Sequence, residues 1–358
     1  MRELGARPPV RAFARETSRS LQPASRPGRV GRQGLTFLAG SLVLACLFVE
    51  VGWGEFRRKD VGTRAGEVLK MSPSPRAAAM GDAMTAAVDD VGAAVYNPAA
   101  LGFLDRPQVA ASHAFWFGDV YHEWLAGAVP DSSGLGGAFA VSLQGLYQAP
   151  IERRDAAGVP LGEFKPYDIV FGLSYGRRIV GDLSGGFTIK HVGLRVTEGA
   201  ASLAGDFGLA WRDDRFMIGA AVQHVGTKVQ FVKEEAALPL TVRLGMAAPA
   251  LLNHHLLVSV DAAGAMDDPV DVHVGVEGTY AATPTLSVYP RAGFTTRPLD
   301  EGLGGLAGLS AGAGLRHRAL SLDYSWSPFG DLGTAHRFGI TLRFGQGSRP
   351  TDENLTTR

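Results

Sequence analysis

The sequence predicts an all-β protein, a transmembrane antiparallel β-barrel of about fourteen strands, on three observations. First, apolar and polar side chains alternate along most of the chain, as in Leu320–Trp326 and again in Phe338–Phe344. A period of two is typical of a strand with one apolar and one polar face. Second, the alternating runs are about ten residues long, enough for a tilted strand to cross a bilayer. Third, hydrophobic residues make up only 46% of the chain, because a barrel places its apolar residues at alternate positions.

Residues 1–54 are predicted to be a secretory signal peptide. Residues 1–34 hold eight arginines and two glutamates, 35–49 are uncharged and mostly apolar, and Gly54 ends the region. A basic start, an apolar core and small residues before the cleavage site define such signals. We therefore expect export to the outer membrane of a Gram-negative-type bacterium and a mature chain without Cys46, the single cysteine. An uncleaved anchor helix, or a lipid anchor at Cys46, is the alternative.

Residues 55–105 are predicted to form an N-terminal periplasmic plug segment with short helices. Residues 55–75 are polar, and we expect them to be loosely ordered. The pairs Ser74-Pro75 and Asn97-Pro98 each place a capping side chain before a proline at the first helical position. A fourteen-stranded barrel is wider than side chains alone can fill. We therefore expect residues 72–104 to sit in the lumen at its periplasmic end, with Asp89 and Asp90 paired to basic side chains or backbone N–H groups.

Residues 106–344 are predicted to form the barrel, and 345–358 a disordered tail. An even number of strands places both ends of the wall on the periplasmic side, with short turns there and long loops outside. The longer polar connections are 149–165, 228–237 and 296–305. The predicted strands are 108–117, 120–129, 135–147, 167–177, 183–195, 202–212, 215–226, 238–248, 254–263, 270–281, 284–296, 306–316, 319–327 and 335–344.

The alternation also predicts which side chains face lipid and which face the lumen. Residues expected on the lipid face include Phe139, Val141, Leu143, Ile169, Phe171, Leu173, Phe187, Ile189, Phe207, Leu209, Val242, Leu244 and Met246. Charged residues expected inside the lumen are Lys190, Asp206, Arg243, Asp261, His273, Glu277, Asp323 and Arg343. Charges of both signs can pair inside, whereas each would cost several kcal/mol in lipid. Aromatic residues near strand ends, among them Trp124 and Tyr280, are expected at the membrane interfaces.

The predicted plug carries the motif that resembles a known family. Its residues are Ala77-Ala78-Ala79-Met80-Gly81-Asp82-Ala83, Asp89-Asp90 and Tyr96-Asn97-Pro98-Ala99-Ala100-Leu101. This pattern resembles the N-terminal signature of PorV/PorQ-like outer-membrane proteins, which are similar in turn to FadL-type transporters of hydrophobic compounds. The resemblance implies a fourteen-stranded barrel with an inserted N-terminal segment. Two positions depart from the pattern, since family members often have glycine at Asp82 and Ala100.

Two functions follow from this resemblance. A PorV-like barrel would serve protein export, and its partners would be secreted proteins or other components of a type IX secretion pathway. A FadL-like barrel would pass small hydrophobic ligands. Apolar residues inside the lumen would favour passage, and long apolar outer loops would favour protein handling. The predicted lumen is rich in charge, which argues against an apolar tunnel. A structural or adhesive barrel is a third possibility.

The sequence predicts no enzyme, cofactor or metal site. The chain has no phosphate-binding loop, no G-x-S-x-G and no H-E-x-x-H. His254-His255 is expected to begin a strand, where neighbouring side chains point to opposite faces. Ser259 and His273 lie on adjacent predicted strands, but a polar lumen brings such residues together by chance. Beyond residue 34 the net charge is −6, and no basic stripe indicates nucleic-acid binding.

Overall fold

The computed structural model describes residues 64–231, 235–266, 268–297 and 303–345. They belong to one compact unit of the chain, residues 53–358. The predicted signal peptide, and all but the first residue of the predicted tail, lie outside the described residues, so both remain predictions. Within the described residues, no helix has the length and hydropathy needed to cross a bilayer.

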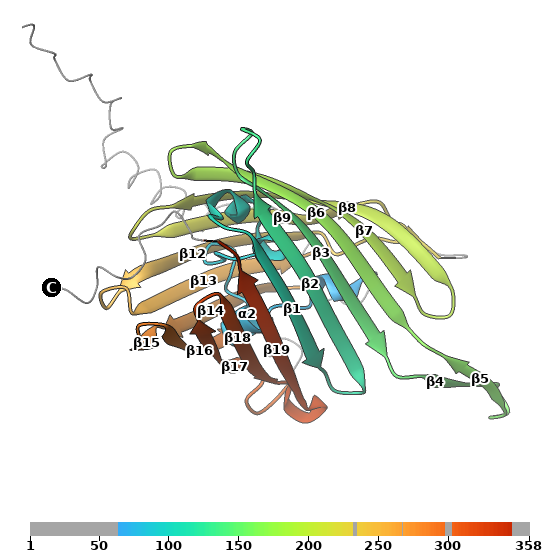
Figure 1. Cartoon of the computed structure of the whole chain (residues 1–358). Helices are drawn as coiled ribbons and strands as arrows, with labels where there is room; N and C mark the ends of the chain where they lie inside the picture. Colours follow the sequence, from blue (N-terminus) through green and yellow to red (C-terminus); the bar gives the residue numbers. More distant parts are fainter. Residues whose placement is uncertain (1–63, 232–234, 267, 298–302, 346–358) are drawn as a thin grey trace, which may run out of the picture. The chain divides into compact units, whose positions relative to one another are not determined.

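The main element is a closed antiparallel β-barrel. One sheet contains fifteen strands in the order β14-β13-β12-β9-β8-β7-β6-β3-β2-β1-β19-β18-β17-β16-β15, and a further pairing between β14 and β16 closes it. Strands β14 and β15 pair with successive parts of β16, so they are two halves of one wall strand. The wall therefore has fourteen strand positions, which confirms the predicted fold class. In Figure 1, β19 lies beside β1, where the two ends of the wall meet.

The wall strands are close to the predicted ranges. They are β1 (Gln108–Phe115), β2 (Val120–Pro130), β3 (Ala138–Gln148), β6 (Tyr167–Val180), β7 (Leu183–Arg195), β8 (Gly199–Arg212), β9 (Met217–Gly226), β12 (Thr241–Leu251), β13 (Leu256–Ala265), β14 (Val270–Gly278), β15 (Tyr280–Thr283), β16 (Leu286–Thr295), β17 (Leu309–His317), β18 (Leu320–Pro328) and β19 (Thr334–Arg343). His254-His255 lies in the turn before β13, so this strand begins two residues later than predicted. Positive φ angles at Leu252, Asn253 and His254 make this a tight turn.

The two ends of the barrel differ in their connections. At the end where β1 begins and β19 finishes, five of the six turns have two to four residues, as expected for the periplasmic side. The opposite end carries the long connections, and we refer to it as the extracellular mouth. Two of its loops contain unpredicted hairpins, β4 (Ile151–Arg154) with β5 (Pro160–Phe164) and β10 (Val229–Gln230) with β11 (Glu235–Ala236). The β4–β5 hairpin projects beyond the wall in Figure 1.

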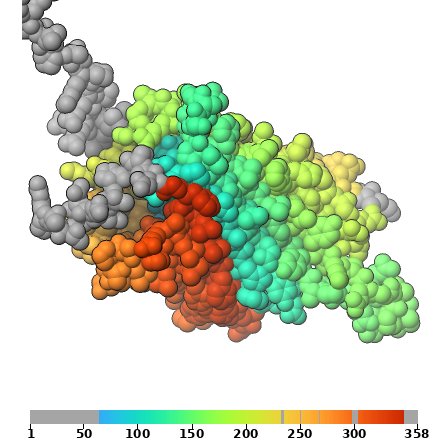
Figure 2. Space-filling view, viewed as in Figure 1, coloured from blue at the N-terminus to red at the C-terminus, as the bar shows by residue number. Residues whose placement is uncertain are grey.

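The outer face of the wall is apolar, as the alternation predicted. Its exposed side chains include Phe139, Val141, Leu143, Ile169, Phe171, Leu173, Phe187, Ile189, Phe207, Leu209, Leu322, Phe338, Ile340 and Leu342. A surface of this kind is stable in lipid and not in water. Figure 2 shows one side of this wall, where the strands near the C-terminus abut those near the start of the barrel. The chain is therefore a membrane-spanning barrel.

One aromatic residue was placed wrongly by sequence. Trp124 is only 5% exposed and faces the interior, together with Ala126 and Ala128 on the same strand. Position near a strand end suggested an interfacial residue, but the pairing of β1 with β2 fixes its side chain inward. Strand β9 also departs from strict alternation. Gln223 and His224 both turn inward at a bulge opposite Asp206, where the β8–β9 register shifts.

Candidate functional site in the barrel lumen

The lumen is occupied by residues 64–107, which we call the internal segment. It contains η2 (Glu67–Lys70), α2 (Pro75–Ala79), α3 (Ala93–Tyr96) and η3 (Pro98–Phe103). At its start, the Ala65 backbone N–H donates to the Ala237 carbonyl in an extracellular loop, at 3.0 Å. Farther along, the Val91 N–H donates to Gln108 at the periplasmic start of β1. The segment therefore runs from one end of the barrel to the other. The predicted periplasmic location holds only for part of it, and residues 64–71 at the mouth were not expected to be ordered.

The predicted helix starts are present in the internal segment. The Ser74 side chain accepts a hydrogen bond from the Ala77 N–H, and Pro75 is the first residue of α2. The Asn97 side chain accepts from the Ala99 N–H at the start of η3. Its amide nitrogen also donates to the carbonyls of Thr85 and Leu209, so one side chain caps a helix and ties the segment to the wall. These two caps stabilise short helices that would be only marginally stable on their own.

Nine glycines of the wall, which we call the glycine belt, face the internal segment. A Cβ atom added to any of them would lie less than 3.0 Å from an atom of residues 75–98. At Gly293, for example, it would lie 2.1 Å from the backbone nitrogen of Gly81, and at Gly275 2.6 Å from the carbonyl oxygen of Met80. The belt consists of Gly176, Gly186, Gly208, Gly219, Gly245, Gly275, Gly293, Gly312 and Gly339. The backbone of the segment thus lies directly against the wall.

A network of ion pairs joins α2 to the wall. Arg76 Nε and Nη2 lie 2.8 Å from the two carboxylate oxygens of Glu277 on β14. Arg291 on β16 donates to Glu277 at 2.6 Å and to Asp323 on β18 at 2.5 Å. The role of Arg76 was not predicted, because this residue lies outside the wall, where alternation gives no information. The network joins three wall strands through one side chain of the segment.

Asp89 and Asp90 have a partner within the internal segment itself. Arg76 contacts Asp89 and lies 3.4 Å from Asp90, whereas the prediction also considered wall residues. The Asp90 carboxylate accepts a hydrogen bond from the Gly92 N–H as well. Burial alone would lower the pKa of Arg76, but Asp89 and Glu277 raise that pKa well above its usual range. Burial alone would raise the pKa of Asp89, and Arg76 instead holds it below its usual range.

A second set of contacts holds the middle of the internal segment. Asp261 on β13 accepts a hydrogen bond from the Thr85 N–H at 2.8 Å and lies 3.4 Å from Arg243 on β12. Arg243 also donates to the Asp82 carbonyl at 2.6 Å. His273 on β14 donates through Nδ1 to the Gly81 carbonyl at 2.7 Å. Three residues predicted from sequence to face the lumen therefore bind the segment.

Three further predicted lumen residues contact only the wall. Lys190 Nζ lies 2.6 Å from Asp206, and both side chains are almost fully buried. The bulged residue His224 donates its backbone N–H to Asp206 at 2.9 Å. Arg343 donates to Ser321 at 2.7 Å near the periplasmic end. Among the described residues, no group of three His, Cys, Asp or Glu side chains is arranged to hold a metal ion.

The extracellular third of the lumen is apolar, and we call this set of residues the mouth cluster. Val170, Val192 and Leu194 point inward from β6 and β7. They pack with Val68 and Leu69 of η2, and both of these are buried. The remaining members are Ala204, Val229 and Leu238. The sequence predicted a charged lumen and did not indicate this apolar region. Valine is common on both faces of a strand, so inward valines give no distinct signal.

Electrostatic contacts hold η2 over the mouth cluster. Lys70 forms an ion pair with Asp268 at 3.0 Å. Arg297, from the next extracellular loop, lies 3.0 Å from Asp271 and 3.5 Å from Asp268. Its guanidinium also donates to the Lys70 carbonyl at 3.5 Å. The short helix is therefore bound at the mouth by polar contacts on one side and apolar contacts on the other.

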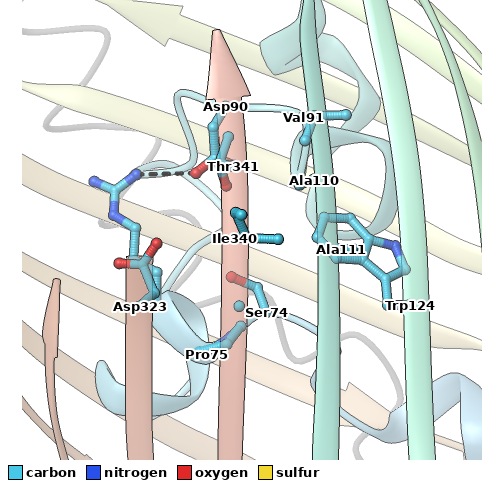
Figure 3. A pocket seen from close by; sticks show the side chains of 12 residues that line it. Ser74, Pro75, Asp90, Val91, Ala110, Ala111, Trp124, Asp323, Ile340 and Thr341 are labelled. Carbon is cyan, nitrogen blue, oxygen red and sulfur yellow. Dashed lines mark hydrogen bonds and ion pairs between the residues drawn. The ribbon is translucent and has the colours of Figure 1, made fainter. Parts of the chain in front are cut away.

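A small cavity lies between the internal segment and the wall strands β1, β2, β18 and β19. Its volume is about 20 Å³, enough for one water molecule. Ser74, Arg76 and Asp90 line it from the segment, and Trp124 and Asp323 from the wall (Figure 3). A space of this size is no passage for a solute larger than water.

Comparisons with known proteins identify the fold. No family model and no curated protein matches the sequence. The structure is similar to the Pseudomonas putida toluene transporter TodX, with a TM-score of 0.53 and 11% identity, covering 75% of this chain and 97% of that one. The chain has the fold of TodX. A TodX deletion mutant, a monoaromatic hydrocarbon channel, gives a TM-score of 0.52 at 11% identity, covering 75% of this chain and 97% of that one.

A Pseudomonas aeruginosa FadL homologue also matches, with a TM-score of 0.49 and 13% identity, covering 79% of this chain and 99% of that one. The similarities to TodX and its deletion mutant establish the fold. They do not show the resemblance of the motif to PorV/PorQ proteins, which therefore stays an interpretation of the sequence.

Proposed function

We propose that this protein passes small hydrophobic compounds across the outer membrane. The mouth cluster is the observation that carries the proposal. Water-filled barrels have a polar interior, yet here Val170, Val192 and Leu194 line the lumen at its extracellular end. Exposing these side chains to water would be unfavourable, and an apolar solute would replace the contacts that η2 now makes. The fold shared with the toluene transporter TodX supports the same class of solute.

The route requires η2 to leave the mouth cluster. Val68 and Leu69 fill the position that an apolar solute would take, and the Lys70–Asp268 ion pair holds them there. Both side chains of this pair are largely buried, at 9% and 13% exposure, so η2 can leave only if both charges are rehydrated, because an unpaired buried charge is costly. Below the mouth, the internal segment fills the lumen with polar contacts and with a second apolar cluster, in which Met80, Met84 and Leu101 pack with wall alanines. Passage therefore depends on a rearrangement of the segment, while the wall stays intact.

Toluene uptake by intact cells tests this function, because their polysaccharide-covered outer leaflet hinders apolar solutes whereas a plain phospholipid bilayer does not. We expect cells with the wild-type barrel to take up toluene faster than cells without it, and to take up a polar solute of similar size no faster. The double variant Val170→Thr and Val192→Thr places two hydroxyls in the mouth cluster and should slow toluene entry several-fold. Val141→Thr makes the same chemical change on the lipid face, where the side chain is exposed, and should have no effect. Equal rates with and without the wild-type barrel would refute the proposal.

The comparisons give no support to the role in protein export. The discriminating feature for that role was a set of long, apolar outer loops. The β4–β5 hairpin is the longest such projection, and Val159 and Leu161 are exposed on it. Charged residues surround them, including Glu152, Arg154 and Glu163. This loop therefore offers no continuous apolar surface for binding a secreted protein.

A further inference from the structure

Arg337 on β19 is a buried cation without a carboxylate partner. Its side chain is 3% exposed, and it donates one hydrogen bond, from Nη1 to Ser327 at 3.2 Å. The Trp116 ring covers the guanidinium with its centroid at 4.7 Å. Among the described residues, no carboxylate oxygen lies within 4.0 Å of its nitrogens. By contrast, Lys190 has Asp206 and Arg291 has Glu277.

Further buried polar atoms without a partner surround Arg337. They are Nε1 of Trp116 and of Trp124, Nε2 of His122, Oε1 of Gln144, Oγ of Ser325 and Nε of Arg337 itself. The strand register brings these residues together. Arg337 pairs with Ser325 on one side and Ala114 on the other, and Ala114 pairs with His122. Trp124 pairs with Gln144 on the next strand. The unpartnered atoms thus form one patch along the inner face of β18, β19, β2 and β3, together with Trp116 in the turn that follows β1.

The chemistry of this patch favours a negative group over water. The ring nitrogens of Trp116 and Trp124 and the Nε of Arg337 can only donate hydrogen bonds. A water molecule could accept from two of them, but it would leave the guanidinium charge uncompensated in a buried site. An anion accepts from several donors and neutralises the charge. The strand neighbours of Arg337 are the small residues Ala114 and Ser325, so no large side chain from them covers the guanidinium.

We propose that Arg337, with the N–H groups of Trp116 and Trp124, forms a binding site for a single negative group inside the barrel. The group is a halide-sized free anion or the carboxylate end of a small organic acid. His122 supplies a further N–H donor. In its neutral form the donor is Nε2, and in its charged form both ring nitrogens can donate. This site stands on the geometry of β1, β2, β3, β18 and β19 alone and does not depend on the proposed passage of hydrophobic compounds.

Crystals of the full barrel grown in sodium bromide test the proposal directly. We expect anomalous density within hydrogen-bonding distance of Arg337. Calorimetric titration of the detergent-solubilised barrel with benzoate, and with neutral benzyl alcohol, distinguishes a free anion from the carboxylate of an organic acid as the ligand. Benzoate that binds and displaces bromide indicates a carboxylate ligand, and bromide that benzoate does not displace indicates a free anion. Both results support an anion site. Density for water alone at Arg337 would overturn it.

Substitutions show whether Arg337 makes the site. Arg337→Gln should weaken binding of the anion at least tenfold, and Arg337→Lys should retain part of it. Arg343→Gln removes a guanidinium that contacts Ser321 at the periplasmic end and should change nothing. Heat-modifiable gel mobility establishes that each variant has folded, and the bromide experiment needs no variant. Unchanged affinity in a folded Arg337→Gln barrel would mean that the bromide is an adventitious ion only, and would refute the proposal.

Discussion

Arg76 of the internal segment holds both carboxylate oxygens of Glu277 on wall strand β14, each at 2.8 Å. This pair lies in the interior, where an unpaired charge is costly. Glu277 keeps Arg291 as a partner in Arg76→Met, so docking of the segment should weaken by about 1.5–3 kcal/mol, the usual effect of losing a hydrogen bond between charged groups. The measurement is the denaturant dependence of trypsin cleavage within residues 64–107.

The matched control removes both charges. In Arg76→Met with Glu277→Met, Arg291 keeps Asp323 as a partner, and no carboxylate is left at position 277. We expect the double variant to lose less docking stability than the single variant. If Arg76→Met alone lowered the docking stability of the segment by less than about 1 kcal/mol, the role assigned to this pair would be contradicted.

The glycine belt predicts a variant that displaces the segment and spares the wall. At Gly219, a Cβ atom would lie 2.2 Å from the Thr85 carbonyl oxygen. Gly219→Leu should therefore destabilise docking by about 1–3 kcal/mol or more, as overpacking does, and raise conductance in planar bilayers. Gly145→Leu is the control, because nothing lies within 4 Å of its added Cβ. Equal conductance of the two variants would refute the close contact.

The wall was largely predictable from sequence, because each strand carries its own signal. The inward or outward direction of Phe171 follows from its immediate neighbours, since successive strand residues point to opposite faces. Trp124 was misplaced for a different reason. Its direction depends on pairing with Ser112, and a single strand with alanines on one face does not reveal which face is the interior.

The contents of the lumen were less predictable, because they depend on contacts between distant residues. The caps at Ser74 and Asn97 are local and were found. The Arg76–Glu277 pair joins residues that are 201 positions apart, and no periodicity indicates it. The inward position of the belt glycines was a usable signal, but glycine in a strand also fits bends. Docking of η2 at the mouth was missed because Val68 and Leu69 lie between the charged residues Glu67 and Lys70, in a run too short to show a period.

The lipid face predicts a strong effect of a single charge. Phe171 is exposed on the outer wall, and Phe171→Arg near the membrane midplane should cost about 2–4 kcal/mol. Phe171→Leu keeps the position apolar and should fold normally. The amount of heat-modifiable barrel in the outer membrane is the measurement. Normal assembly of Phe171→Arg would mean that this side of β6 does not face lipid.

The pKa of Asp89, held below its usual range by Arg76, predicts an acid limit for docking. A lowered pKa in the folded state contributes stability above the unfolded value of about 3.9, and this stability is lost as pH falls through the folded value. The side chain is 46% exposed, so solvent screens the effect and a modest change is expected. Hydrogen exchange of the segment, corrected for the intrinsic pH dependence of the exchange rate, should stay constant from pH 8 to about 5 and rise below about 4. Asp89→Asn should flatten this rise. If the variant showed the same pH profile as the wild type, the rise would belong to other carboxyl groups.

The central claim is that the internal segment crosses the lumen and reaches the extracellular mouth, and one cysteine experiment tests it most directly. In a Cys46→Ser background, Glu67→Cys places a thiol on η2, where the Glu67 side chain is 57% exposed. Thr285→Cys places one in a periplasmic turn. With a membrane-impermeant maleimide, intact cells should label Glu67→Cys, and Thr285→Cys should react only after the outer membrane is permeabilised. Labelling of Glu67→Cys only after permeabilisation would contradict the account, because η2 would then lie at the periplasmic end.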